Sequence, residues 1–235
     1  MKYIVTLIIF TVSLFSQEYF AKIEPLNKYD IKSSVSGKVV LSDLSKEATF
    51  IKDDLIIKID DKVNKIELRQ TQSKIRSMNQ ILKIHKQTLN SFNKVSSKSK
   101  FDKDKQKVVI LNTQITLADL NTKLQTLKDT INKKNIKVKS LYLNKIYVKK
   151  DDYVNPGTLL LSAYDLSKGK LEIFLSKDEL KDLQNKTILI DGKKEDIKIN
   201  KIYKTTDDKH LSSYKVELIL NNVSSFSKLV KITIK

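Results

Sequence analysis

The sequence predicts an elongated chain of mixed α and β structure, in which a β-sandwich is interrupted by an antiparallel helical hairpin and followed by a small antiparallel β-barrel. Three observations lead to this fold class. Residues 62–135 contain no glycine or proline and carry apolar residues at heptad spacing, which is typical of long helices. The segments on either side of this stretch are related to each other. Residues 170–235 alternate in the manner of short strands.

Residues 1–16 have the composition of a secretory signal peptide. Lys2 is followed by an apolar run of about 13 residues that ends at Phe15, which is short for a span of a bilayer. We expect cleavage after Ser16, with cleavage after Ala21 or retention as an anchor as the alternatives. The chain contains no cysteine, which excludes a lipoprotein anchor, disulfides and thiolate metal sites.

The expected helical hairpin occupies residues 62–135. Its apolar positions form one narrow seam on each arm: Leu68, Ile75, Leu82 and Leu89 with Thr71, Met78, His85 and Phe92 on the first, and Ile110, Leu117, Leu124 and Ile131 with Leu120 and Leu127 on the second. The polar segment 96–105 interrupts the seam and is suited to an exposed reversal. Two arms of roughly 35 residues predict an antiparallel coiled coil about 50 Å long, which is a spacer or docking device.

The segments that flank the hairpin predict a split β-domain, which we assign to residues 17–61 and 136–169. The two copies are aliphatic and β-branched runs separated by turn-forming residues. They align in two stretches: residues 32–40 with 139–148, and residues 47–60 with 151–164. Two half-motifs that are separated by an insertion can close into one small sandwich.

Residues 170–235 form the expected β-barrel domain. Strand-like runs of about five to eight residues alternate there with polar segments, at the spacing of a small antiparallel barrel. The polar segment 176–184 is expected to form a short helix. Asp191-Gly192 is a good sequence for a hairpin turn.

The formal net charge of +18 raises the question of an anionic partner. Only Arg69 and Arg76 are arginines, although arginine is the better reader of phosphates and guanine edges. The lysines are spread along the whole chain. We therefore expect a solvated basic surface and no nucleic-acid partner.

No residue pattern indicates catalysis. Paired aspartates lie at expected turns or strand ends, where turn formation explains them better than general acid and base roles: Asp53-Asp54, Asp60-Asp61, Asp151-Asp152 and Asp207-Asp208. His85 and His210 are the only histidines, and neither has a metal-ligand spacing. We expect a protein that is not an enzyme, with no catalytic residue, no cofactor and no metal.

The order of these segments resembles the HlyD family of membrane-fusion or periplasmic adaptor proteins, over essentially the whole chain after residue 16. Three stretches carry the resemblance: residues 35–40 (VSGKVV), 152–160 (DYVNPGTLL, the most specific) and 171–180 (LEIFLSKDEL). The resemblance implies that the split β-domain is lipoyl-like. Glu47, Asp53 and Asp151 stand where the family usually has glycine, so we expect altered turns there.

The function implied by the resemblance is that of a periplasmic adaptor subunit of an efflux or secretion system. The implied partners are an inner-membrane transporter, proton-driven or of the ABC type, a TolC-like outer-membrane channel, and further copies of the chain within the assembled pump. The implied location is the periplasm, in association with the inner membrane through these partners. The alternative is a periplasmic structural or adhesive coiled-coil protein without a pump.

The resemblance also implies a channel-binding site near the tip of the hairpin. Adaptors that engage a TolC-like channel carry arginine, then leucine four residues later, then serine seven residues further on. His85, Leu89 and Ser96 have this spacing, with histidine in place of arginine. His85 and Leu89 are also seam positions, so packing within the hairpin is the competing explanation.

Overall fold

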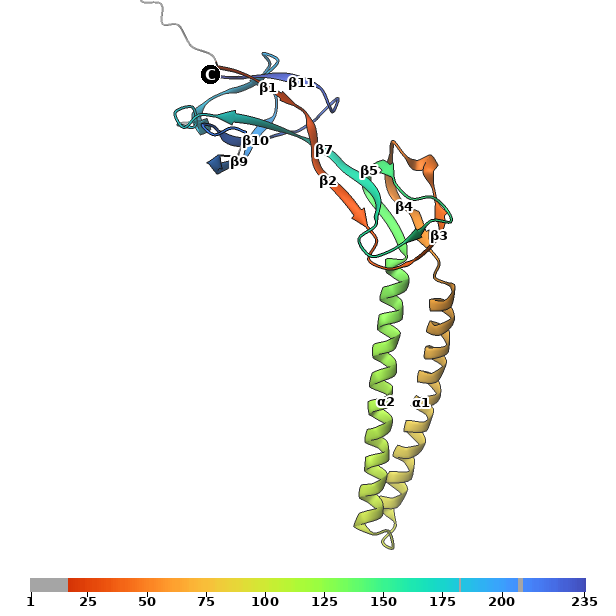
Figure 1. Cartoon of the computed structure of the whole chain (residues 1–235). Helices are drawn as coiled ribbons and strands as arrows, with labels where there is room; N and C mark the ends of the chain where they lie inside the picture. Colours follow the sequence, from red (N-terminus) through yellow and green to blue (C-terminus); the bar gives the residue numbers. More distant parts are fainter. Residues whose placement is uncertain (1–16, 182, 207–208) are drawn as a thin grey trace, which may run out of the picture. The chain divides into compact units, whose positions relative to one another are not determined.

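The structure is a computed structural model that describes residues 17–181, 183–206 and 209–235 (Figure 1). The expected signal peptide, residues 1–16, lies outside the described residues. The described chain divides into two compact units, residues 30–163 on the one hand and residues 17–29 with 164–235 on the other. Strands β2 (Glu24–Lys32) and β7 (Leu159–Leu175) each contribute residues to both units.

The hairpin consists of two long helices, α1 (Lys62–Lys94) and α2 (Lys100–Lys133), which run side by side (Figure 1). At about 1.5 Å per residue, each helix is about 50 Å long. Every seam residue expected on the two arms is buried or half-buried. Ile110, Leu117 and Leu127 are the most buried apolar ones. The antiparallel coiled coil is therefore confirmed.

The reversal between the helices is shorter than the expected residues 96–105. α2 begins at Lys100 because Ser99 caps it, and the Ser99 Oγ accepts a hydrogen bond from the Asp102 amide at 3.1 Å. Asp102 also places a negative charge in the first turn, where the helix dipole favours it. Residues 100–105 are thus the first turns of a helix, because a good cap outweighs their loop-like composition.

The two half-motifs fold together in the unit of residues 30–163, which confirms the expected fold class. Its strands lie in the order β6-β3-β4-β5-β7. The elements are β3 (Gly37–Ser42), the 3-10 helix η1 (Leu44–Lys46), β4 (Thr49–Ile59), β5 (Asn135–Ile146), β6 (Tyr153–Val154) and the first residues of β7. Both copies supply the aliphatic core: Val39, Ile51, Ile56, Ile57, Ile59, Val138, Leu143, Ile146, Val148, Val154, Leu160, Leu161 and Ala163.

The turns of the two half-motifs share one backbone feature. Ala48 and Asp151 are both left-handed, with φ of 56° and 77°. Each also donates its amide to the other half-motif, Ala48 to the Leu143 carbonyl at 2.8 Å and Asp151 to the Val39 carbonyl at 2.9 Å. The two copies therefore exchange backbone hydrogen bonds across the domain.

Glu47 and Asp53, which we expected at glycine positions, have ordinary extended backbone. Glu47 has φ −58° and ψ 147°, and its carboxylate accepts the Ile146 amide at 2.7 Å. Asp53 lies within β4, opposite Lys139. The expectation is wrong for both residues. Glu47 lies one residue before Ala48, the left-handed position of the first turn, and Asp53 lies inside a strand.

The second unit contains two groups of strands. One is the sheet β1-β11-β8, formed by β1 (Gln17–Lys22), β11 (Leu229–Ile234) and β8 (Ile188–Ile190). The other joins β7, β10 (Tyr214–Leu220) and β9 (Ile197–Thr206) in that order. The core between them is Ala21, Ile23, Leu171, Ile173, Leu175, Leu183, Ile188, Ile190, Val216, Leu218, Leu220, Val230, Ile232 and Ile234.

Residues 17–29 belong to this second unit, which differs from the assignment of residues 17–61 to the split β-domain. β1 pairs antiparallel with β11, from Gln17 opposite Ile234 to Lys22 opposite Leu229. Ala21 is buried in the same core. The C-terminal domain of expected residues 170–235 thus takes its first strand from the N-terminal part of the chain.

Asp191 and Gly192 form the predicted hairpin turn. Both have positive φ, 48° and 79°, as the two central residues of a type I′ turn require. Ile190 and Lys193 exchange two backbone hydrogen bonds at 2.9 Å on either side of them.

The polar segment 176–184 begins as expected but does not continue as a regular helix. The Ser176 amide donates to Glu179 Oε2 at 2.5 Å, and the Glu179 amide donates to Ser176 Oγ at 3.4 Å, which is a capping box. The described residues that follow form turns and the 3-10 helix η2 (Leu183–Asn185). Glu179 also accepts a hydrogen bond from the Tyr19 hydroxyl at 2.7 Å, which ties this segment to β1.

A buried carboxylate holds the base of the hairpin. Asp61, at the start of α1, is only 2% exposed and lies 2.9 Å from Lys65 Nζ and 3.8 Å from Lys58 Nζ. The Asn135 amide, beyond the end of α2, approaches the same carboxylate at 3.5 Å. Burial alone would raise the pKa of Asp61, but these cationic and amide partners outweigh it and hold the pKa below its ordinary value.

Replacing Ala48 with glycine should raise the free energy of unfolding by about 0.5–1 kcal/mol, because glycine adopts the left-handed backbone without steric cost. Urea unfolding followed by circular dichroism measures the change. The same substitution at Ala118, an exposed position inside α2, should instead lower the free energy by about 1 kcal/mol. A lower free energy of unfolding for the Ala48→Gly variant would contradict the assignment of a strained left-handed backbone to Ala48.

Replacing Asp61 with asparagine should lower the free energy of unfolding by about 1–2 kcal/mol at pH 7, since two partly exposed lysines lose their counter-charge. The folded pKa of Asp61 is depressed, so its stabilisation is present above the unfolded pKa of about 3.9 and is lost as the pH falls through the folded pKa. Urea unfolding of both proteins between pH 7 and pH 2 should therefore show a difference that shrinks in acid. A constant difference would rule out the charged form as its source.

Candidate partner-binding site on the helical hairpin

The three residues of the expected channel-binding site lie at one end of the hairpin but not on one surface. His85 and Leu89 are one turn apart on α1, and both are half-buried in the seam. The Gln106 side chain of α2 donates to the His85 backbone carbonyl at 3.0 Å. Ser96 is exposed in the connection between the helices. Of the three side chains, that of Ser96 is the one most accessible to a partner.

Local contacts hold the shape of the tip. The Val95 amide donates to the Phe92 carbonyl at 3.4 Å, and the Lys98 amide donates to the Val95 carbonyl at 3.3 Å. The Lys98 ammonium lies 4.7 Å from the centroid of the Phe92 ring, within the range of a cation–π interaction. Ser96 is therefore presented on a turn with its own internal structure.

The tip is positively charged. Between residues 92 and 107 the sequence has six lysines and only two aspartates. Asp104 is paired with Lys107 at 2.9 Å, and this hydrogen bond and the positive charge of Lys107 lower the pKa of Asp104. A partner that meets the tip meets hydrogen-bonding groups and positive charge, and its binding is then sensitive to salt.

α2 carries a second apolar face in addition to its seam, so the expectation of one narrow seam per arm is wrong for this helix. Phe101, Val108, Leu111 and Ile115 are 76%, 52%, 57% and 60% exposed. Their spacing of seven, three and four residues places them on one side of the helix, opposite the seam. We call these four residues the outer stripe.

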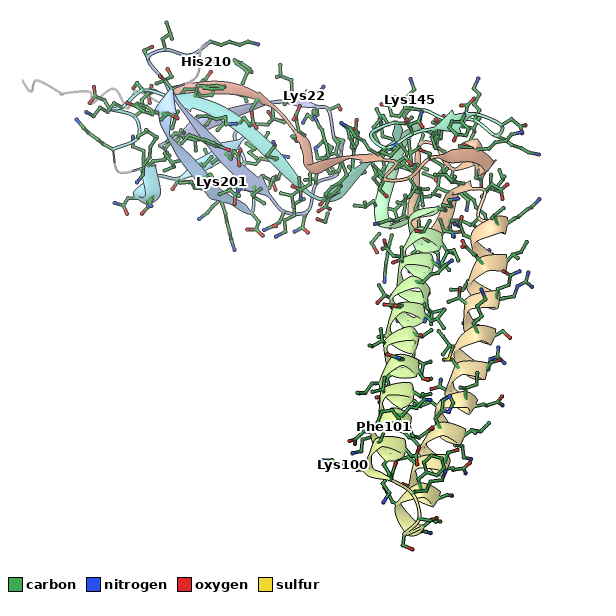
Figure 2. All side chains as sticks on the ribbon, turned by 60° about the horizontal axis from the view of Figure 1, so that its bottom comes forward. Lys22, Lys100, Phe101, Lys145, Lys201 and His210 are labelled. Atoms are coloured by element: carbon green, nitrogen blue, oxygen red, sulfur yellow. The ribbon has the colours of Figure 1, made fainter. Side chains whose placement is uncertain are left out.

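The outer stripe was visible in the sequence as a second heptad series, Phe101, Val108 and Ile115, which is offset from the seam. It begins next to the tip, where Phe101 and Lys100 are labelled in Figure 2. Contiguous apolar patches on a protein surface mark interaction sites, and these four exposed side chains follow one face of α2.

The described residues contain neither a cluster of metal-binding side chains nor a helix that could span a membrane. Within residues 17–181, 183–206 and 209–235, no group of three or more histidine, aspartate or glutamate side chains is placed to hold a metal ion. The His210 ring stacks on Phe174 with the centroids 3.5 Å apart. In the same part of the chain, no helix combines the length and the hydropathy that crossing a membrane requires.

No family model matches the sequence, and no curated protein sequence is significantly similar to it. Solved structures do have a similar fold. A MacA-MexA chimera with the Pseudomonas aeruginosa MexA α-hairpin domain aligns over 94% of this chain and 81% of its own, with a TM-score of 0.67 and 18% identity. The membrane fusion protein Spr0693 from Streptococcus pneumoniae R6 aligns over 93% and 97%, with a TM-score of 0.68 and 9% identity.

MacA from Actinobacillus actinomycetemcomitans aligns over 94% of this chain and 78% of its own, with a TM-score of 0.59 and 18% identity. The chain therefore has the fold of the membrane fusion proteins, which are also called periplasmic adaptor proteins. The fold implied by the sequence resemblance is confirmed.

Neighbouring residues of α2 distinguish the seam from the outer stripe. Replacing Ile110, which is 8% exposed, with lysine should lower the free energy of unfolding of the hairpin by at least about 2 kcal/mol. Replacing Leu111, which is 57% exposed, with lysine should change it by less than about 0.5 kcal/mol. Urea unfolding followed by the helical circular dichroism signal gives both values, and similar losses at the two positions would show that the outer stripe is part of the hairpin core.

Proposed function

We propose that this chain is the periplasmic adaptor subunit of an efflux or secretion system of the HlyD type, and that it bridges an inner-membrane transporter and an outer-membrane channel. The observation that supports this most strongly is the hairpin of about 50 Å inserted between the two halves of a β-domain. This arrangement occurs in a fold shared with membrane fusion proteins. A rod of this length suits the spanning of a distance between two partners.

In this proposal the chain performs no chemistry and binds no cofactor. Its tip meets the channel through Ser96 and the surrounding lysines, while His85 and Leu89 support the tip from within the seam. Contacts of this polar and charged kind are individually weak. Several adaptor copies around one channel would raise the total affinity by multivalency.

The outer stripe supports self-association of adaptor copies within the assembled pump. Full burial of one large apolar side chain contributes about 1.5–3 kcal/mol, so four partly covered ones provide a moderate driving force. The same stripe is the observation that favours the second candidate function, a periplasmic coiled-coil protein that associates with itself and has no pump. The two candidates differ in what the tip contacts.

A photo-crosslinking amino acid at position 96 tests the proposal in the native cell. We expect an adduct that mass spectrometry identifies as an outer-membrane channel subunit. The matched control replaces Ser77, an exposed serine in the middle of α1, and should give no channel adduct. Adducts at position 96 that contain only further copies of this chain would favour the structural protein over the adaptor.

A further inference from the structure

The strands of the second unit leave one side open. β8 is an end strand that pairs with β11, and β9 is an end strand that pairs with β10, so these two described strands do not pair with each other. Between them lies a groove of about 710 Å³, lined by η2, β8, the segment after it and β9. An end strand presents a row of backbone amide and carbonyl groups that have no strand partner.

The floor of this groove is apolar. Ile188 of β8 is 8% exposed and belongs to the core of the unit. Ile197 and Ile199 of β9 pack against the same core but are only half-buried, and they line the groove. The core of this unit is therefore incompletely covered along β9, at the place where one more strand would cover it.

The rim of the groove is basic. Lys194, Lys198 and Lys201 line it and are exposed, and Glu195 is the one carboxylate among the lining residues. Within the described part of the chain, neither Lys194 nor Lys198 forms an ion pair. β9 itself contains three lysines and no acidic residue, and Lys201 is labelled on it in Figure 2.

We propose that the groove between β8 and β9 binds an extended, acidic segment of a partner protein, which adds to the free edge of β9 as a further strand. Strand addition supplies backbone hydrogen bonds, and alternate side chains of the added strand point to opposite faces. One face would cover Ile197 and Ile199, which calls for apolar residues. The other would meet the lysines, which calls for Asp or Glu. The segment is therefore one in which apolar and acidic residues alternate.

A second copy of this chain fits the groove poorly. Pairing of β9 with β9 would bring lysines of one copy close to lysines of the other, and like charges across a strand pair are destabilising. Lysines on an end strand are also a known protection against pairing with the same strand of another copy. The rim thus excludes self-pairing and selects an acidic partner. This inference does not depend on the adaptor function, because it concerns a different unit from the hairpin.

The test measures binding of fluorescein-labelled peptides to the purified protein by fluorescence anisotropy. The probe is a peptide of about nine residues in which valine and glutamate alternate, close to the length of β9. One comparison peptide has lysine in place of glutamate. A second keeps valine and glutamate but is N-methylated on alternate amides, which removes backbone donors without changing charge. We expect saturable binding of the first peptide only.

The protein variant is Lys194→Glu with Lys198→Glu, which should weaken binding of the valine-glutamate peptide by at least about tenfold. The matched control is Lys83→Glu with Lys86→Glu, two exposed lysines of α1 in the other unit, which should leave the affinity unchanged. The circular dichroism spectra of all proteins should agree.

Four results would overturn the proposal. They are no saturable binding to the unaltered protein, equal binding of the N-methylated peptide, equal affinity of the groove variant, and a dimer in sedimentation that the valine-glutamate peptide dissociates. The second result would mean that the site recognises only negative charge. The last would mean that a further copy of the chain occupies the groove.

Discussion

Strands β4 and β5 pair from Thr49 opposite Leu143 to Lys58 opposite Asn135, and this ladder brings both ends of the hairpin to one edge of the β-domain. The helices begin and end within a few residues of the last pair. Asp61 then joins the start of α1 to Asn135, the first residue of β5. The direction and the register of the two helices at their base are therefore consequences of strand pairing, and every function assigned to the tip depends on that register.

Away from the base, the hairpin depends on a seam that is only partly apolar. Thr71 and Thr113 are buried in it beside leucine and isoleucine, and Gln106 reaches across it to a backbone carbonyl. Such a seam stabilises two helices whose register is already fixed by the β-domain. It is less suited to selecting that register by itself. The outer stripe on α2 is separate from it, so association through that stripe leaves the hairpin seam intact.

Patterns with a short period were predictable from the sequence, and so was the pairing of two half-motifs that resemble each other. The pairing of a segment that has no such counterpart was not predictable. Heptad spacing predicted the hairpin, and Asp191-Gly192 predicted a two-residue turn, because both depend on neighbouring residues. The partner of β1 was not predictable, since its pairing with β11 depends on which distant edge is free. Ala48 was missed by one residue because a resemblance carried by short motifs does not fix the register of a turn. The place of Ser96 at the tip was predictable, whereas the groove beside β9 depends on two strands that do not pair.

The hairpin also determines how much chain entropy the β-domain loses on folding. Without it, pairing β4 with β5 would close a flexible loop of about 75 residues, at a cost of about 4 kcal/mol. The turn of five residues at the tip lowers this entropic cost, because α1 and α2 can associate from the tip towards the base. Each contact that forms brings the next pair of residues close together, so each further contact closes only a short loop. Once they have done so, Lys58 and Asn135 are already neighbours. The insertion therefore shortens the loop that must be closed when the two half-motifs pair. Their large separation in the sequence then adds little to the entropic cost of folding.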